Sequence, residues 1–490
     1  MTSPTPASAD ASGYTPDPRR WRALAVCLTV GFMTLLDVSI VNVALPSIQR
    51  GLGATPADLS WVVSGYALTF GLSLVPSGRV GDARGRRTSF LVGLTIFTLA
   101  SAACGISRGP TELVVSRLIQ GAAGGILSPQ VSGLIQLLFR GKERGKAFGL
   151  FGATIGISTA VGPLLGGLLI QAAGEDHGWR WVFFVNLPIG VMAFIAALRL
   201  LPVRAKESRQ PIRGSFDPFG VLLLGAGVTS VMLPLVQEQQ WHGGRKWLLL
   251  VLAALLLGGF VAWERRQMRV GHLPLIDLSL FSLRSYSLGC LLGLAYFAGF
   301  TTIFFIFTLF VQNGLKYSAL EAGLAVTPFA IGSAVSARIG GGIVFRYGRR
   351  LITLGLGLVV IGMAGTVLAV QVDPGRSIGF AAAAPLLVAG FGSGLVISPN
   401  VTLTLDQVPV ERAGIAGGVQ QTGQRIGSAA GIALVGAVFF ARVAASGDWA
   451  HAFVIGLSTA VGLVAIALVL ALADLYGTKA NRARSRAPQD

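Results

Sequence analysis

Apolar residues in this chain are gathered into long blocks that short polar segments separate. A helix rises about 1.5 Å per residue, so about twenty apolar residues cross the roughly 30 Å hydrocarbon layer of a bilayer. Blocks of that length exceed what the core of a water-soluble protein requires. The pattern predicts an all-α integral membrane protein with about fourteen transmembrane helices. We place them at 22–45, 58–77, 88–106, 111–139, 147–173, 181–201, 216–236, 247–263, 286–311, 320–345, 351–372, 378–405, 413–442 and 450–475.

Proline and tryptophan mark the ends of some blocks. The first helix is expected to begin at Arg22 and to stop at Leu45, because Pro46 has no N–H to donate to a helix. The short block 247–263 is flanked by Trp247 and Trp263. Tryptophan at both ends suits a helix whose termini lie in the membrane interfaces.

Basic residues alternate between the two sides of this helix series. One set of segments holds 27 of the 39 Lys and Arg residues, and the opposite loops hold 7. Because Lys and Arg accumulate in cytoplasmic loops, both termini are expected in the cytoplasm, which requires an even number of spans. Residues 1–18, rich in Pro, Ser, Thr and Asp, are expected to form a disordered cytoplasmic tail.

Composition agrees with a membrane protein and excludes several other classes. Charged residues make up 12% of the chain, against about 25% in soluble domains, and mean hydropathy is +0.69. The net charge of +18 does not indicate nucleic-acid binding, because the basic residues lie in short loops between apolar blocks. Three cysteines in apolar stretches and four scattered histidines give no support to a disulfide scaffold or a metal site. We therefore expect no metal, no cofactor and no catalytic residues.

An internal repeat relates the two halves of the chain. The pattern Gly-x3-[Asp/Phe]-x2-Gly-Arg-Arg occurs at 78–87 and again at 341–350, and Gly-x3-Ser-Pro occurs at 124–129 and 394–399. Two related bundles around a midplane site are typical of transporters. The expected organisation is a six-helix bundle at 19–203, a linker with two inserted helices at 204–270, a second six-helix bundle at 271–475 and a basic cytoplasmic tail at 476–490.

Two opposite charges are predicted to lie inside the membrane. Asp37 lies within the first helix, and Arg117 lies near the outer end of the fourth. A charge at a helix centre costs about 2.5–3.5 kcal/mol on insertion scales, so a charge found there usually has a role. Both residues lie about 9–12 Å from the predicted outer ends, so they could meet. Asp37 is a candidate proton carrier and cation-sensing carboxylate, and Arg117 a modulator of its protonation. The alternative is a purely structural ion pair.

A polar stripe interrupts the block 413–442. Gln421, Gln424 and Ser428 share one helical face, with Arg425 beside them. Polar groups at this depth should face water or a polar ligand rather than lipid. These four residues are candidates for a cavity wall, the alternative being interhelical hydrogen bonds alone.

The turn after the second helix combines glycine, arginine and one acid. Gly78 and Gly85 would permit a tight reversal, while Arg86 and Arg87 would lie among cytoplasmic headgroups. Asp82 could pair with an arginine or cap a helix N terminus in the other bundle. Such a contact would be a latch that closes the cytoplasmic side, although charge topology alone explains the arginines.

The fifth helix contains a candidate hinge at Gly162, Pro163, Gly166 and Gly167. Glycine and proline together allow bending and close helix packing. Bending there could decide to which side a central cavity opens, and close packing without bending is the alternative.

The chain resembles the fourteen-helix drug:proton antiporter branch of the major facilitator superfamily over nearly its whole length. The resemblance implies two six-helix bundles at helices 1–6 and 9–14, proton antiport, alternating access and export of small amphipathic molecules from a bacterial cell. The matching segments are LDVSIVNVALP at 36–46, WVVSGY at 61–66, the turn at 78–87, RLIQGAAGG at 117–125, GPLLGG at 162–167 and WRWVFFVNLP at 179–188.

Two departures from the family pattern bear on mechanism. Ser158 stands where many members have the first glycine of the fifth-helix motif. The second half has no acid in mid-membrane, because Glu321 lies only at the outer mouth of its helix. We therefore hypothesise that substrates are neutral or singly charged, and equally efficient export of a dication would contradict this.

The expected function is an exporter whose partners are protons, a small-molecule substrate and the lipid bilayer, without nucleic acid and acting as a monomer. The chain has no Gly-x4-Gly-Lys-[Ser/Thr] phosphate loop for direct use of ATP. An uptake symporter, or a lipid or metabolite carrier on the same scaffold, is the runner-up. A membrane-embedded enzyme would need reactive side chains, such as paired histidines and acids, gathered at one face. It is disfavoured because the loops are too short and too poor in such residues.

Overall fold

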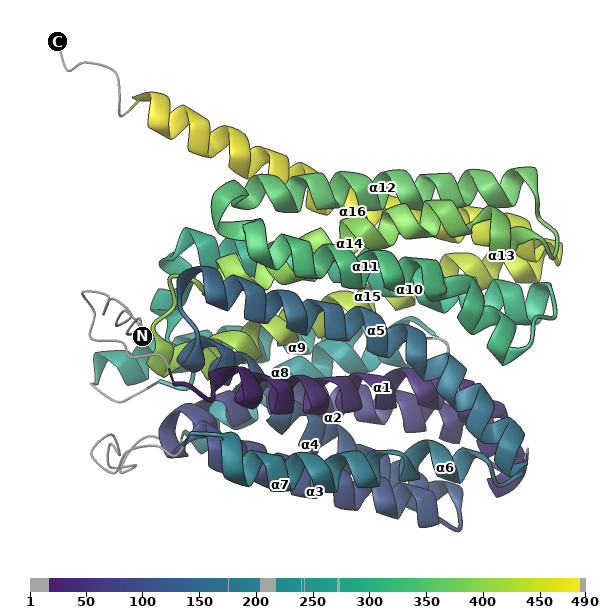
Figure 1. The fold of residues 1–490 in the computed structure, drawn as a ribbon, viewed down its shortest axis with the longest axis horizontal. Helices are drawn as coiled ribbons and strands as arrows, with labels where there is room; N and C mark the ends of the chain where they lie inside the picture. Colours follow the sequence, from purple (N-terminus) through teal and green to yellow (C-terminus); the bar gives the residue numbers. More distant parts are fainter. Residues whose placement is uncertain are drawn as a thin grey trace, which may run out of the picture.

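The computed structural model describes residues 17–174, 176–202, 217–238, 240–241, 243–270 and 274–484 of the 490. The described chain is built of helices (Figure 1). They are α1 (Arg20–Leu52), α2 (Pro56–Arg84), α3 (Arg86–Ile106), α4 (Pro110–Leu138), α5 (Gly141–Ala173), α6 (Trp179–Phe184), α7 (Asn186–Leu200), α8 (Pro218–Val236), α9 (Leu248–Arg269), α10 (Arg284–Leu309), α11 (Ala319–Tyr347), α12 (Arg349–Val372), α13 (Ile378–Ala381), α14 (Ala383–Leu405), α15 (Ala413–Ser446) and α16 (Trp449–Arg484).

Within the described residues, 13 helices are long and apolar enough to cross a membrane. Helix α4 is not among them, although it contains 29 residues. It carries Arg117, Gln120, Gln130 and Gln136, all of which are buried away from the surrounding lipid. With α4 included, and with α6 and α7 counted as one span, the described helices provide the fourteen predicted crossings.

The helices form two bundles, each with its own main hydrophobic core, although the core of the first bundle also includes Tyr286, Leu405 and Ala416 of the second. Helices α1–α7 lie in the lower part of Figure 1 and α10–α16 in the upper part. The bundles meet along two seams, where α5 packs on α11 and α2 packs on α15. Helices α8 and α9 pack on each other, and α8 also packs on α2 and α15. The inserted pair therefore covers the seam between α2 and α15.

The first turn of α1 and the last turn of α16 lie at the same end of the bundle, at the left of Figure 1. The junctions before Arg86, Gly141 and Arg349 lie at this end as well. We call it the basic end. Termini at one end agree with an even number of spans.

The expectation that Pro46 ends the first helix is wrong, since α1 continues through it to Leu52. A proline inside a membrane helix removes one hydrogen bond, and neighbouring helices and side chains compensate for the loss. Helix α2 likewise passes through Pro76 and ends at Arg84, not at 77. Both helices instead end at a glycine with positive φ, α1 at Gly53 and α2 at Gly85.

The turn predicted at 78–87 is much shorter than expected. Gly78 lies inside α2, and the reversal takes place at Gly85, whose φ of 107° is left-handed. Gly348, the repeat equivalent, joins α11 to α12 with a φ of 55°. Glycine is needed at both junctions because other residues rarely adopt positive φ.

Other helix ends differ from the prediction in smaller ways. Helix α9 extends to Arg269, six residues beyond the predicted end, and α16 extends to Arg484 rather than ending at 475. Basic residues in the last turn of α9, Arg266 and Arg269, interact favourably with the helix dipole, which supports the extension of this helix. The predictions for residues 1–16, 204–216 and 485–490 lie outside the described residues.

Candidate functional site

Asp37 is completely buried inside the first bundle, with none of its surface exposed. Its Oδ2 accepts a hydrogen bond of 2.6 Å from Arg117 Nη1, and the two form an ion pair. Its Oδ1 accepts bonds of 2.9 Å from both Gln120 Nε2 and Asn186 Nδ2. The structure thus brings the two predicted charges together, and it surrounds the carboxylate with polar partners from α4 and α7.

Arg117 is held by further contacts on its other sides. Its Nε donates to the Val62 carbonyl at 3.1 Å, and its Nη1 also donates to Gln120 Oε1 at 2.7 Å. The guanidinium carbon lies 4.2 Å from the centre of the Tyr66 ring. A buried pair is stable only when its remaining hydrogen-bonding groups are satisfied, and these contacts provide that satisfaction.

Sequence reasoning missed three members of this network. Gln120 and Asn186 lie in segments noted only as family motifs, and Ser101 of α3 was not singled out. Ser101 Oγ accepts bonds from Gln120 Nε2 at 2.5 Å and from Asn186 Nδ2 at 3.1 Å. The available signal was a polar residue within an apolar block, the criterion that identified Asp37.

Protonation of Asp37 would rearrange this network. The ionised carboxylate accepts from three side chains, whereas a carboxylic acid has an O–H to donate and no charge to pair with Arg117. Through side chains and the Val62 carbonyl, the network links α1, α2, α3, α4 and α7. One proton can therefore alter the packing of five helices. Because Asp37 is fully buried, a ligand between the bundles does not touch it in this conformation.

Asp82 bridges the two bundles at the basic end. Its Oδ2 accepts from the backbone N–H of Ile415 at 3.0 Å, and its Oδ1 accepts from that of Gly414 at 3.2 Å. These two N–H groups belong to the first turn of α15, where the helix dipole favours an anion. Gly78 makes this approach possible, since a Cβ there would lie 2.5 Å from the Gly414 carbonyl oxygen.

The two arginines of the predicted latch have different partners. Arg86 pairs with Asp82 at 2.8 Å, donates to the Gly133 carbonyl at 2.7 Å and contacts the carbonyl of Val410 in the other bundle. Arg87 donates to the Leu198 carbonyl of α7 at 2.6 Å. Arg86 therefore takes part in the contact between bundles, whereas the Arg87 contact stays within the first bundle.

The polar stripe on α15 contacts several neighbours. Gln421 pairs with Ser128, and its Nε2 donates to Ser132 Oγ at 3.3 Å, so it faces α4. Gln424 lies next to Gly293 of α10. Arg425 lies over Phe70 of α2, 4.4 Å from the ring centre. Ser428 is partly buried. The stripe thus spans the boundary between the bundles instead of lining a single wall.

The candidate hinge residues pack closely within a continuous α5. A Cβ at Gly162 would lie 1.8 Å from Ser39 Oγ, and one at Gly166 would lie 2.9 Å from a side-chain carbon of Ile40. Pro163 packs next to α11, since a Cβ added at Gly323 would lie 3.3 Å from its Cβ. Gly167 is partly buried. These glycines hold α5 tightly against α1, and their part in bending stays a prediction.

Replacing Gly162 by alanine is expected to destabilise the protein by about 1–3 kcal/mol, the usual effect of overpacking. Thermal unfolding of the purified protein in detergent measures this as a lower midpoint. Gly357→Ala on α12, where a new Cβ meets nothing within 4 Å, is the matched control. Adding Ser39→Gly to Gly162→Ala should restore part of the loss, and an unshifted midpoint for Gly162→Ala would contradict the close packing.

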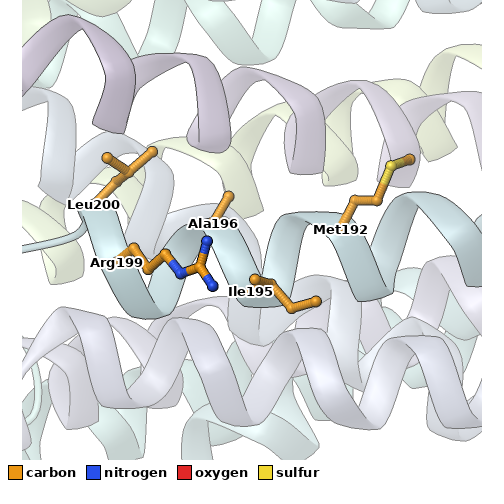
Figure 2. A pocket seen from close by; sticks show the side chains of 5 residues that line it. All are labelled: Met192, Ile195, Ala196, Arg199 and Leu200. Carbon is orange, nitrogen blue, oxygen red and sulfur yellow. The ribbon is translucent and has the colours of Figure 1, made fainter.

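Grooves also occur on the outer surface of the first bundle. Figure 2 shows one on α7, lined by Met192, Ile195, Ala196, Arg199 and Leu200. Met192 is 64% exposed and Ile195 is 46% exposed, so this apolar groove faces the lipid. Its position on a single outer helix separates it from Asp37 and from the seams between the bundles.

Comparison with known sequences agrees with the resemblance drawn from the motifs. Residues 27–432 match the model of the Major Facilitator Superfamily. A probable actinorhodin transporter of Streptomyces coelicolor is 37% identical over 433 residues, covering 88% of this chain and 74% of the relative. The puromycin resistance protein pur8 of Streptomyces alboniger is 34% identical, covering 93% and 91%. The multidrug transporter protein MdtP of Bacillus subtilis is 33% identical, covering 84% and 74%.

Solved structures share the fold at low sequence identity. The human organic anion transporter MFSD10 superposes with a TM-score of 0.65 at 16% identity, covering 93% of this chain and 100% of that one. The proton:xylose symporter XylE gives 0.64 at 14% identity, covering 92% and 94%. The predicted fold class is confirmed. The chain belongs to the Major Facilitator Superfamily and is a multi-pass membrane transporter of small molecules rather than an enzyme.

Proposed function

We propose that this transporter exports small amphipathic drugs, antibiotics or metabolites in exchange for protons by alternating access. Relatives that are 33–37% identical are named for transport of, or resistance to, actinorhodin, puromycin and multiple drugs. The observation that carries proton coupling is the fully buried pair of Asp37 and Arg117. A carboxylate kept at this depth is costly, and reversible protonation gives a reason for its retention.

The conformation observed supports an alternating mechanism that is closed at the basic end. Asp82 joins α2 to α15 there, and Arg144 of α5 forms an ion pair of 3.4 Å with Asp406 of the second bundle. Gly145 and Gly341 bring α5 and α11 together at the same level. In our proposal the basic end faces the bacterial cytoplasm, the protein acts as a monomer, and protonation of Asp37 from outside loosens the first bundle so that these contacts can open.

The direction of coupling can be tested with purified protein in proteoliposomes. A panel of dyes and antibiotics is loaded, and a pH gradient of either sign is imposed. Antiport predicts that substrate leaves the compartment that protons enter, and that substrate flux moves protons the opposite way. Substrate and protons moving in the same direction would instead establish the uptake alternative.

Removing the cross-bundle contact should weaken closure at the basic end. Asp82→Ala leaves the first N–H groups of α15 without their anionic partner, so the closed state should lose about 1–3 kcal/mol. We expect a cysteine placed at Ser132, which is 2% exposed beside Gln421, to react at least several-fold faster with a maleimide in inverted vesicles. The background is a protein in which Cys27, Cys104 and Cys290 are replaced.

Arg87→Ala is the matched control for this experiment. It removes a charge from the same junction but affects only the bond to Leu198 within the first bundle. Labelling in this variant should stay at the wild-type rate. If Asp82→Ala leaves labelling unchanged, or if Arg87→Ala accelerates it equally, the Asp82 contact does not control closure.

A further inference from the structure

Arg425 differs from the paired Asp37 and Arg117, because no counter-charge among the described residues contacts it. It lies twelve residues after the start of α15, about 18 Å along the helix. Its guanidinium carbon lies 4.4 Å from the centre of the Phe70 ring in the other bundle. Arg117, in contrast, has a carboxylate, a backbone carbonyl and an amide oxygen as partners.

Such an arrangement is unfavourable without a ligand. A charge in the membrane interior usually pairs with an opposite charge or with backbone carbonyls. Arg425 is partly buried, so water solvates its charge less well than on the surface, and a cation–π contact contributes only about 0.5–2 kcal/mol. Arg425 therefore has unused capacity for an anion.

A second polar group without a hydrogen-bond partner among the described residues lies near the same Phe70 ring. Tyr66 is 3% exposed, and its buried hydroxyl has no hydrogen-bond partner in the part of the chain that the structure describes. This hydroxyl lies next to Gly124, and so does the edge of the Phe70 ring over which Arg425 lies. The Tyr66 ring also stacks on Phe70, with ring centres 6.0 Å apart. A guanidinium, a free phenol O–H and an aromatic surface thus meet where α2 faces α15.

We propose that Arg425 and the Tyr66 hydroxyl bind the anionic group of the transported molecule, and that Phe70 contacts its aromatic or apolar body. The substrate class is then an organic monoanion, such as an aromatic carboxylate. This inference rests on the proposed transport function and narrows the predicted neutral or singly charged substrates. The guanidinium supplies charge and parallel N–H donors that fit a carboxylate, and the phenol adds a third donor.

The proposed anion site lies between the two bundles. Arg425 belongs to the second bundle, whereas Tyr66 and Phe70 belong to the first, so a bound anion would contact both. A ligand held by both bundles is affected when they move relative to each other. Asp37 lies beyond Tyr66, against Arg117, so the proton site and the anion site are separate but share the Tyr66 ring.

Binding of three probes that share one aromatic body tests the proposal. The probes are radiolabelled 2-naphthylacetate, 2-naphthylethanol and 2-naphthylmethylamine, which are anionic, neutral and cationic. Binding is measured with purified protein in lipid nanodiscs, with empty nanodiscs as the blank. The wild type should bind the carboxylate at least about tenfold more tightly than the alcohol, as expected for a charge-assisted contact.

Variants locate the source of this preference. Arg425→Gln should reduce it to less than about threefold, Arg425→Lys should keep part of it, and Tyr66→Phe should weaken carboxylate binding alone. Arg442→Gln, on an exposed part of the same helix, should behave as wild type. Equal or undetectable binding of the three probes up to millimolar concentration, or a preference that survives Arg425→Gln, would overturn the proposal.

This measurement needs no ion gradient, so it separates the two proposals. A carboxylate preference that depends on Arg425, in a protein without proton-driven flux, leaves the anion site intact and rejects the proposed antiport. Proton-driven export without any charge preference supports antiport and rejects the anion site.

Discussion

Replacing Asp37 by asparagine is expected to abolish proton-driven accumulation of substrate while leaving a folded protein in the membrane. Asparagine has nearly the same shape, and its Oδ1 can still accept from Gln120 and Asn186. Loss of the counter-charge of Arg117 should lower the stability of the variant without preventing it from folding. It cannot exchange a proton, so the gradient has no site on which to act. One proton per substrate across a two-unit pH difference can drive about 100-fold accumulation, and the variant should fall to a ratio of about 1.

Flux in proteoliposomes with an imposed gradient measures this loss. Exchange of labelled for unlabelled substrate without a gradient should persist in Asp37→Asn, which distinguishes lost coupling from lost folding. Glu112→Gln is the control, since Glu112 is an exposed carboxylate on the same helix as Arg117. Unchanged gradient-driven accumulation in Asp37→Asn would eliminate Asp37 as the coupling site.

Replacing Arg117 by methionine is expected to have the largest effect on stability. It leaves the Asp37 carboxylate buried without its charge partner, at a cost of about 3–5 kcal/mol. It also removes the donors that the Val62 carbonyl and Gln120 Oε1 accept. The unfolding midpoint in detergent, and the yield of monodisperse protein, should both fall sharply.

The double variant Asp37→Asn/Arg117→Met provides the internal control. With the carboxylate neutralised, removal of the arginine should cost much less than it does in the wild type. A coupling energy of about 1 kcal/mol or more between the two sites is expected for groups in direct contact. Strictly additive effects would show that the two groups do not stabilise each other as an ion pair.

The sequence alone determined the membrane class and the number of spans, and it predicted that Asp37 and Arg117 lie at similar depth and could meet. These follow from physical requirements that act along the chain, because the hydrocarbon layer demands long apolar blocks and penalises each buried charge. The repeat also predicted the related glycine junctions at Gly85 and Gly348. Asp37 and Arg117 could be matched because depth in a bilayer can be counted in residues, even though α1 extends further than predicted.

Only the tertiary structure showed which groups contact the predicted site residues. It showed that Ser101, Gln120 and Asn186 complete the Asp37 network, and that Asp82 caps α15 across the bundle boundary. It also overruled the local signal of Pro46, through which α1 continues. Periodicity gives the depth of a side chain, but contacts between residues hundreds of positions apart depend on how each helix is rotated and packed. That is why only the folded structure showed that Arg425 has no counter-charge within the described ranges.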